Sequence, residues 1–415
     1  MQESSALNFF ESGEVSGFVH HYLQNSLEYY GLKDGLIDIP SVYKEKLSLL
    51  ENKAVFYNYD YFNGDVLNTF SDKKYLNPGE INKEKNHIFD LNVEGWSSKQ
   101  TPVAKDLHKS LKGRIQLNKI FYITGNLAEK LVYEHWVKTI DDEEKINIVE
   151  ICAWDSFGYD TYVRKHRHRV NQPDYYIERK NDIDKTYIDN KFYINLNRRS
   201  RKWRSYFVYK LFEHKIQDFG IISHSRTDDD VDTIDGFNYA EAASFNNFLV
   251  NNLPLIADTK DFETNWANYL NNEIHSNALF SVVGETLQEN YDNTSLFYSE
   301  KSFRPMILGQ PMLIWGQRYC NKKLSTKLGY KLYNNWFDYS FDSIKDEKER
   351  ANALVLEIKR VCEKLKLMSR SEQINWAYKD EETLLYNRNR LRYNEFSINN
   401  FFEFIEQMAI NEKIQ

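Results

Sequence analysis

Short apolar runs alternate with amphipathic stretches along this chain, and this alternation limits its fold more than any other feature. In the first half, residues 16–31 have helical spacing, and apolar runs typical of strands lie at 53–62, 118–126 and 145–154. The second half repeats the pattern, with strands predicted at 191–200, 219–223, 277–286 and 311–316 between helices at 201–216, at about 239–251 and from about 302. Strands that alternate with helices form parallel sheets covered by helices, so the sequence predicts an α/β fold.

The length of 415 residues exceeds what one core usually holds, since domains typically have ~100–200 residues. A polar, charge-rich stretch at about 164–188 separates the two halves, and helical spacing continues through 351–368. We therefore predict an N-terminal domain over 1–180, a second domain over 181–380, and C-terminal helices over 381–415 that pack back toward the first domain. Two α/β domains in tandem favour a ligand site in the cleft between them, at the carboxyl ends of their strands.

The cysteines and the apolar runs indicate where the protein works. Cys152, Cys320 and Cys362 are too scattered for a disulfide framework or a CxxC metal site, which fits a reducing compartment. The longest apolar runs fall short of the roughly 20 residues that cross a bilayer, and the N-terminus lacks the features of a signal peptide. We expect a cytoplasmic protein with no membrane span.

The segment FYSEKSFRPMILGQPMLIWG (297–316) places three charged residues at the start of an apolar stretch. Ser299 is a suitable helix cap, and a helix N-terminus offers N–H groups and a positive dipole end to a phosphate. Lys301 adds a full positive charge there. Because Pro305 has no amide hydrogen and suits a first turn, we expect the helix to begin near 302–303, with the charges before it on the lip of a site. In the alternative, Glu300 and Arg304 form an ordinary surface pair worth ~0.3–0.5 kcal/mol.

Two other segments are rich in cations although the net charge is −7. VRKHRHR (163–169) lies beside a polar, turn-prone stretch and is interpreted as a solvated loop or a local anion-binding patch. NRRSRKWR (197–204) follows a predicted strand and is the stronger candidate for a ligand site. The negative total charge gives no general attraction to nucleic acid, so such a partner would depend on a local patch.

ALFSVVGET, followed by the segment 297–316, resembles the donor-binding region of fucosyltransferase-like and exostosin-like glycosyltransferases of the GT-B type, above all their bacteriophage and marine bacterial relatives. The resemblance covers about 278–340 and extends more loosely to INLNRRSRKWR (194–204). It implies two Rossmann-like domains that face each other across a cleft, with the nucleotide sugar on the C-terminal domain. It further implies transfer to an acceptor hydroxyl without a metal or other cofactor.

The resemblance assigns roles to the donor-binding residues. Glu300 would accept hydrogen bonds from the ribose, Lys301 would contact the diphosphate, and Glu285 would contact the sugar or the ribose, unless its carboxylate caps its own loop. Arg204, or a neighbour among Arg198, Arg199 and Arg201, would bind the leaving diphosphate. The complete predicted set is Arg198, Arg204, Glu285, Ser299, Glu300, Lys301 and Arg304. "GET" and "SFRP" depart from the family pattern, so neither the sugar nor the choice among UDP, GDP and TDP donors carries over.

The acceptor side is predicted from weaker patterns. Base candidates are Glu14, His20 and Asp65, whereas a retaining mechanism would need no dedicated base. For the acceptor we favour hydroxymethylated bases of phage DNA, acted on in the host cytoplasm, over glycans or lipopolysaccharide. DNA would be held by the cations of the first patch together with two later ones: Arg164, Lys165, Arg167, Arg169, Arg179 and Lys180.

Two competing interpretations use other features of the sequence. TDDDVD (227–232) resembles the acidic motif by which another class of glycosyltransferases holds a divalent metal, although such a run is also typical of a solvated loop. The 29 Tyr and 8 Trp would also suit a non-catalytic carbohydrate-binding protein. Such a protein would have no need of adjacent Glu300 and Lys301 or of a second cation cluster.

Overall fold

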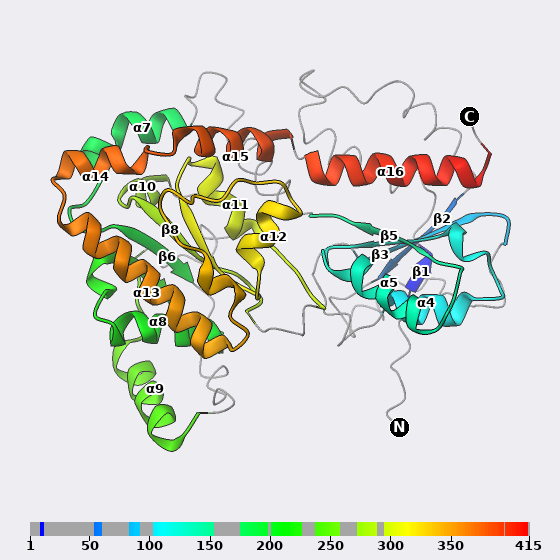
Figure 1. Ribbon diagram of the computed structural model, residues 1–415, viewed down its shortest axis with the longest axis horizontal. Helices are drawn as coiled ribbons and strands as arrows, with labels where there is room; N and C mark the ends of the chain where they lie inside the picture. Colours follow the sequence, from blue (N-terminus) through cyan, green and yellow to red (C-terminus); the bar gives the residue numbers. More distant parts are fainter. Residues whose placement is uncertain are drawn as a thin grey trace. The chain divides into compact units, whose positions relative to one another are not determined.

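The computed structural model describes ten parts of the chain: residues 9–11, 54–59, 83–91, 103–152, 175–197, 201–225, 237–257, 272–288, 294–393 and 395–413. The chain divides into two compact units (Figure 1). Unit 1 comprises 1–156, 291–297 and 393–415, and unit 2 comprises 157–290 and 298–392.

Unit 1 is built on one five-stranded sheet with the order β1-β2-β3-β4-β5. β1 pairs with β2 in antiparallel fashion, and the other neighbours are parallel. The strands are β1 (Phe9–Glu11), β2 (Ala54–Tyr59), β3 (Asn86–Leu91), β4 (Ile120–Thr124) and β5 (Asn147–Glu150). Strands β2, β4 and β5 lie within three of the predicted apolar runs.

Helices cover both faces of the sheet of unit 1. α4 (Val103–Leu111) and α5 (Glu129–Thr139) pack on one face, where Tyr122 of the sheet and Tyr133 of α5 share a single apolar cluster. α16 (Glu395–Asn411) covers the other face, where the rings of Phe121 and Phe404 meet edge to face with centroids 5.2 Å apart. The sheet therefore lies between two helical layers (Figure 1).

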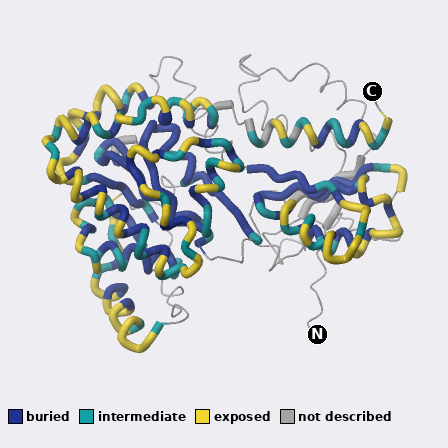
Figure 2. The backbone as a smooth tube through the Cα atoms, in the orientation of Figure 1, coloured by how far each residue is buried: buried dark blue, intermediate teal, exposed yellow. Residues whose placement is uncertain are grey.

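Unit 2 contains a four-stranded, fully parallel sheet with the order β7-β6-β8-β9. Its strands are β6 (Tyr193–Asn197), β7 (Gly220–His224), β8 (Phe280–Gly284) and β9 (Met312–Trp315). Nearly every residue of these strands is buried, as expected for parallel strands covered on both faces (Figure 2). β6, β8 and β9 lie within the strands predicted for the second half, and β7 extends one residue beyond its predicted range of 219–223.

The helices of unit 2 form layers on both sides of this sheet. α8 and α13 lie on one face, where Phe207 of α8 stacks on Trp315 and Arg350 of α13 lies over the same indole ring. α10 and α11 lie on the other face, beside Ile194. The helices are α7 (Tyr175–Thr186), α8 (Lys202–Glu213), α9 (Tyr239–Asn252), α10 (Asn272–Ser276), α11 (Glu300–Ile307), α12 (Cys320–Thr326), α13 (Glu347–Lys366), α14 (Arg370–Ala377) and α15 (Glu381–Tyr393).

The structure corrects the prediction for the described part of the polar stretch, 175–188, while 164–174 lies outside the described residues. Residues 175–186 form helix α7, and the Arg179 side chain, 2% exposed, binds inside unit 2, so this part belongs to unit 2. The helix predicted at 16–31 lies outside the described residues. Among the helices that the structure describes, none is long and apolar enough to cross a membrane.

Candidate functional site

The candidate site lies at the carboxyl ends of β6 and β8 in unit 2. The chain passes from β6 through α8 to one edge of the sheet and from β8 through α11 to the other edge, so the strand order reverses between β6 and β8. The crevice at such a reversal is where open α/β sheets bind ligands. Glu285 directly follows β8 at this point, and Arg204 lies in the first turn of α8.

Glu285 anchors the start of α11. Its fully buried carboxylate accepts hydrogen bonds from the Ser299 N–H at 3.0 Å, from Ser299 Oγ at 2.8 Å, from the Thr286 N–H at 2.9 Å and from Ser302 Oγ. Ser299 is the N-cap residue, as predicted, but its side chain makes no capping bond to the helix because it donates to Glu285. The geometry assigns Glu285 a positioning role for α11, and its contact with a donor stays a prediction.

Helix α11 begins earlier than predicted. It starts at Glu300 instead of 302–303, and Pro305 lies inside it. Ser299 and Ser302 both donate hydrogen bonds to the Glu285 carboxylate, and these bonds hold the first helical turn, which begins at Glu300 directly after Ser299. Pro305 therefore removes one internal hydrogen bond that a first-turn proline would not remove.

The three charged side chains of α11 form an ion cluster on its first turn. Glu300 Oε1 lies 2.7 Å from Lys301 Nζ and 3.8 Å from Arg304 Nη2. The Glu300 side chain is 8% exposed, against 29% for Lys301 and 21% for Arg304, so the cluster is more shielded than an ordinary surface pair. One carboxylate between two cations leaves a net charge of about +1 on this turn.

The ionisation of the cluster follows from burial and charge together. Burial disfavours the charged form of Glu300, but Lys301 and Arg304 outweigh it and lower the pKa of this carboxyl. Burial lowers the pKa of Lys301, and the charge of Glu300 opposes this effect. The charges of Arg204, which lowers the pKa of Lys301 further, and of Glu285, which raises it, make smaller contributions.

A small cavity lies beside this cluster on the α11 face of β6 and β8. It is lined by Lys301, Arg304 and His275 together with apolar residues of the two strands, and its volume is ≈ 40 Å³. A cavity holds a water molecule from roughly 10–15 Å³ upward, whereas small-molecule sites occupy ~300–1,000 Å³. This cavity has room for a few waters or an anionic group, and not for a nucleoside.

Of the two arginines of the predicted cluster that the structure describes, Arg204 is buried. It is 1% exposed, and its Nε donates to the backbone carbonyl of Glu285 at 2.8 Å. It therefore joins the end of β8 to the start of α8. Arg201 is half-exposed at the N-cap of α8, and Arg198 and Arg199 lie outside the described residues.

Sequence reasoning missed two buried side chains near these strand ends. His224 ends β7, its Nε2 lies 2.9 Å from Ser205 Oγ, and burial and then the charge of Arg204 lower its pKa to about 4. Arg350 donates to the Gln288 carbonyl at 2.7 Å. A polar residue at the end of an apolar strand was a usable signal for His224. Arg350 gave none, because an arginine on an amphipathic helix usually faces water.

Most acceptor-side predictions fall outside the described residues: Glu14, His20, Asp65, Arg164, Lys165, Arg167, Arg169 and the acidic run 227–232. Arg179 is described, and its predicted contact with DNA is wrong. Its guanidinium donates to the carbonyls of Gly309 at 3.2 Å and of Ala278 at 3.0 Å, inside unit 2. Lys180 is exposed and pairs with Glu381. In the described parts of the chain, no group of three His, Cys, Asp or Glu residues is arranged to hold a metal ion.

Comparisons with known proteins add little to this geometry. No family model matches the chain, and no curated protein matches its sequence. Among solved structures, the chain is similar to the α,α-trehalose 6-phosphate synthase from Burkholderia multivorans, with 10% sequence identity and a TM-score of 0.34. The match covers 76% of this chain and 66% of that one, which is just under two thirds of its length. A TM-score this low carries no argument for function.

Proposed function

We propose that this protein is a glycosyltransferase that moves a sugar from a nucleotide-sugar donor to an acceptor hydroxyl. The observation that carries the proposal is the first turn of α11, which Glu285 anchors at the strand reversal of unit 2 and which presents Glu300 and Lys301. At the end of one strand, this arrangement combines a carboxylate that can accept hydrogen bonds from a ribose diol, a cation, and the N–H groups of a helix N-terminus. The resemblance of 278–340 to the donor region of GT-B enzymes supports the same assignment.

The chemistry of the donor matches the groups in this turn. When the bond between sugar and diphosphate breaks, negative charge grows on the departing diphosphate. Lys301, the N-terminal end of α11 and the nearby guanidinium of Arg204 provide positive potential there without a metal ion. Glu300 stays ionised, so its oxygens accept hydrogen bonds from a ribose diol.

Because Lys301 already pairs with Glu300, donor binding requires the two side chains to share their bonds with the ligand. Fixed cations at a developing charge typically contribute ~10²–10³-fold in rate. We therefore expect Lys301→Ala to affect turnover more strongly than binding of the free nucleotide. The reaction class, inverting or retaining, is left open by this proposal.

Calorimetry with UDP, GDP, TDP and CMP derivatives tests the donor proposal. Lys301→Ala and Glu300→Gln should each weaken the nucleotide that the wild type binds, while Lys345→Ala, which changes an exposed lysine of the same unit, should not. Glutamine is preferred over alanine at 300 because it removes only the charge, whereas alanine would also remove the volume and the hydrogen-bonding oxygen of a buried side chain. If no derivative binds, or if both site variants bind like the wild type, the proposed site is wrong. Activity that survives EDTA would support the metal-free mechanism.

For the acceptor, we propose hydroxymethylated bases of phage DNA, held by the cations of 164–169. The burial of Arg179 removes one cation that this hypothesis used, and a neutral glycan acceptor is the second candidate. Neutralising Arg164, Lys165, Arg167 and Arg169 together should abolish transfer to hydroxymethylated duplex and flatten its salt dependence, with donor hydrolysis intact. Unchanged transfer in this variant, or transfer to saccharides alone, would exclude DNA. Glycan binding without any nucleotide binding would instead indicate a non-catalytic carbohydrate-binding protein.

A further inference from the structure

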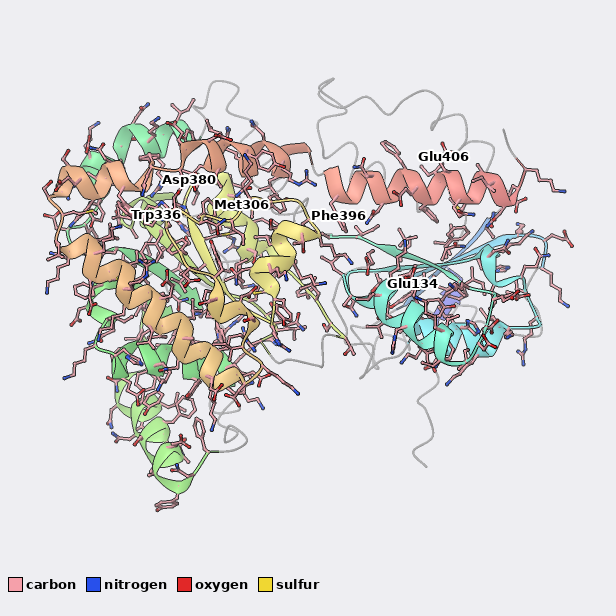
Figure 3. The ribbon with its side chains drawn as sticks, viewed as in Figure 1. Glu134, Met306, Trp336, Asp380, Phe396 and Glu406 are labelled. Atoms are coloured by element: carbon pink, nitrogen blue, oxygen red, sulfur yellow. The ribbon has the colours of Figure 1, made fainter. Side chains whose placement is uncertain are left out.

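Unit 1 contains a groove along the outer edge of β5. Within the described residues, β5 pairs only with β4, and α5 and α16 flank its other edge. The space between these elements has a volume of ≈ 340 Å³. Figure 3 labels Glu134 on α5 and Phe396 at the start of α16, both of which line the groove. The volume is within the ~300–1,000 Å³ that small-molecule sites occupy.

The backbone of β5 presents alternate residues to this groove. The N–H of Ile151 donates to the Thr124 carbonyl of β4 at 2.9 Å, so the odd-numbered residues of this stretch face β4. Backbone groups alternate in direction along a strand of a parallel sheet. Ile146, Ile148 and Glu150 therefore direct their backbone groups toward the groove.

Side chains occupy both ends of this edge. The N–H of Ile146 donates to Tyr133 Oη at 3.0 Å, and Asn400 Nδ2 donates to the Glu150 carbonyl at 2.7 Å. Between these two bonds lie the N–H and C=O of Ile148, one donor and one acceptor a few ångströms apart. An added peptide strand would have to displace both side-chain bonds, so the edge is protected against strand addition. A compact ligand fits between them without displacing either.

The lining combines aromatic rings with planar polar groups and carries little net charge. Three carboxylates and two ammonium groups line the groove, which gives a net charge of about −1, so its charge gives no attraction to phosphates and nucleic acids. Phe396 is half-buried, so part of its ring faces solvent. The charged and amide side chains that line the groove are Lys130, Glu134, Lys145, Asn147, Glu150, Asn400, Glu403 and Gln407.

We propose that this groove binds a neutral saccharide. A sugar ring has an apolar C–H face that packs on an aromatic ring and an edge of hydroxyls that both donate and accept hydrogen bonds. The carboxylate and amide groups of Glu134 and Gln407 accept from such hydroxyls, and Gln407 also donates to them. The Ile148 backbone pair matches two neighbouring hydroxyls or one acetamido group. As an acceptor site, the groove rests on the proposed function and on its second candidate acceptor, a neutral glycan. Its binding of a sugar does not need a donor.

Direct binding of simple sugars tests this inference. Saturation-transfer NMR and calorimetry on the full chain should detect binding of at least one of glucose, galactose, fucose and N-acetylglucosamine in the absence of nucleotide. Phe396→Ala and the double variant Glu134→Gln, Gln407→Ala should each weaken this binding at least tenfold. Phe402→Ala and Asn399→Ala, which change the same residue type or the same functional group on α16 outside the groove, should leave it unchanged.

The fold of each variant is checked by far-UV circular dichroism and by its melting temperature. The inference is overturned if no sugar binds the wild type, if the groove variants bind like the wild type, or if tetra-alanine peptide binds where sugars do not. Nucleotide-sugar turnover with no sugar bound in the groove would reject the groove and keep the donor proposal. Sugar binding with no nucleotide binding would do the reverse.

Discussion

Glu129 makes the stability of unit 1 depend on pH across the neutral range. It lies in the first turn of α5, is 3% exposed, and accepts a hydrogen bond from Asn126 Nδ2 at 3.0 Å. Burial raises the pKa of Glu129 to about 8 from its ordinary value of 4.5. The hydrogen bond from Asn126 opposes this shift, and the nearby charge of Glu150 adds to it. At pH 7 the folded protein therefore holds a proton on Glu129 that the unfolded chain has released.

The sign and size of the effect follow from this difference. The folded state binds more protons than the unfolded state between pH 4.5 and about 8, so the free energy of unfolding falls as the pH rises through this window and is flat above it. A shift from 4.5 to about 8 corresponds to at most ~5 kcal/mol. Buried sites respond with a high effective dielectric constant, which weakens electrostatic effects. We therefore expect the free energy of unfolding to change by about half of this maximum, ~2–3 kcal/mol.

Glu129→Gln replaces the carboxyl with a neutral group of the same shape, so it reproduces the protonated form at every pH. Calorimetric melting of the two proteins should coincide near pH 4.5, and the variant should melt about 5–10 °C higher at pH 8. Glu134→Gln, on the same helix but half-exposed, serves as the control for loss of a charge and should give no such divergence. A constant gap between wild type and variant from pH 4.5 to 8 would show that Glu129 does not hold the proton.

Three further predictions concern other contacts of the described residues. Glu285→Ala leaves buried donors at the start of α11 without an acceptor, so it should destabilise unit 2 by ~3–5 kcal/mol in denaturant unfolding. Glu285→Gln keeps one oxygen that can accept these bonds and should destabilise unit 2 by less than about 2 kcal/mol. Equal losses in the two variants would mean that the carboxylate does not anchor the helix. Gly309 has φ +61°, and an added Cβ would lie 2.0 Å from the Tyr176 ring. Gly309→Ala should therefore lower the free energy of unfolding by more than the ~1–2 kcal/mol that a left-handed alanine costs. A melting temperature like that of the wild type would contradict this geometry. The bond from Lys112, with lesser help from the Glu144 N–H and from His108, lowers the pKa of Asp142 to about 2 from 3.8. The stability that Asp142 contributes relative to Asp142→Asn should therefore be constant above about pH 5 and fall as the pH is lowered toward 2, and an undiminished difference at pH 2 would argue against it.

The charged turn of α11 joins local and long-range effects. Its sequence places a carboxylate four residues before a guanidinium, so Glu300 and Arg304 are neighbours on any helix that contains them, whereas the pairing of Glu300 with the adjacent Lys301 depends on the conformation of the long lysine side chain. Whether that turn exists depends on Glu285, because its carboxylate receives the Ser299 N–H and two hydroxyls. Ser299 was predicted as the helix cap, but nothing in the sequence predicted that Ser302 also donates to Glu285.

The sequence alone predicted the strands of unit 2 and three strands of unit 1, but neither β1 nor β3. It predicted α8, α9, α11 and α13, but not α4 and α5 of unit 1 or α7, α10 and α12 of unit 2. Apolar runs at 53–62, 145–154 and 311–316 each contain a strand, because burial on both faces of a parallel sheet requires a continuous apolar run that is visible locally. The helical spacing through 351–368 corresponds to α13, whose periodic apolar residues Leu354 and Ile358 are fully buried. The alternation of these elements was sufficient for the α/β class.

The tertiary structure alone decided which charged and polar groups are buried and what they bind. Arg179 lies in a stretch that reads as solvated, yet its guanidinium is enclosed because it reaches the Gly309 carbonyl, 130 residues further along the chain. The groove of unit 1 likewise forms only because α16, at the end of the sequence, packs against the edge of β5. Hydrophobic periodicity is a property of neighbouring residues, whereas the burial of a charge depends on whether distant backbone groups replace the water that it loses.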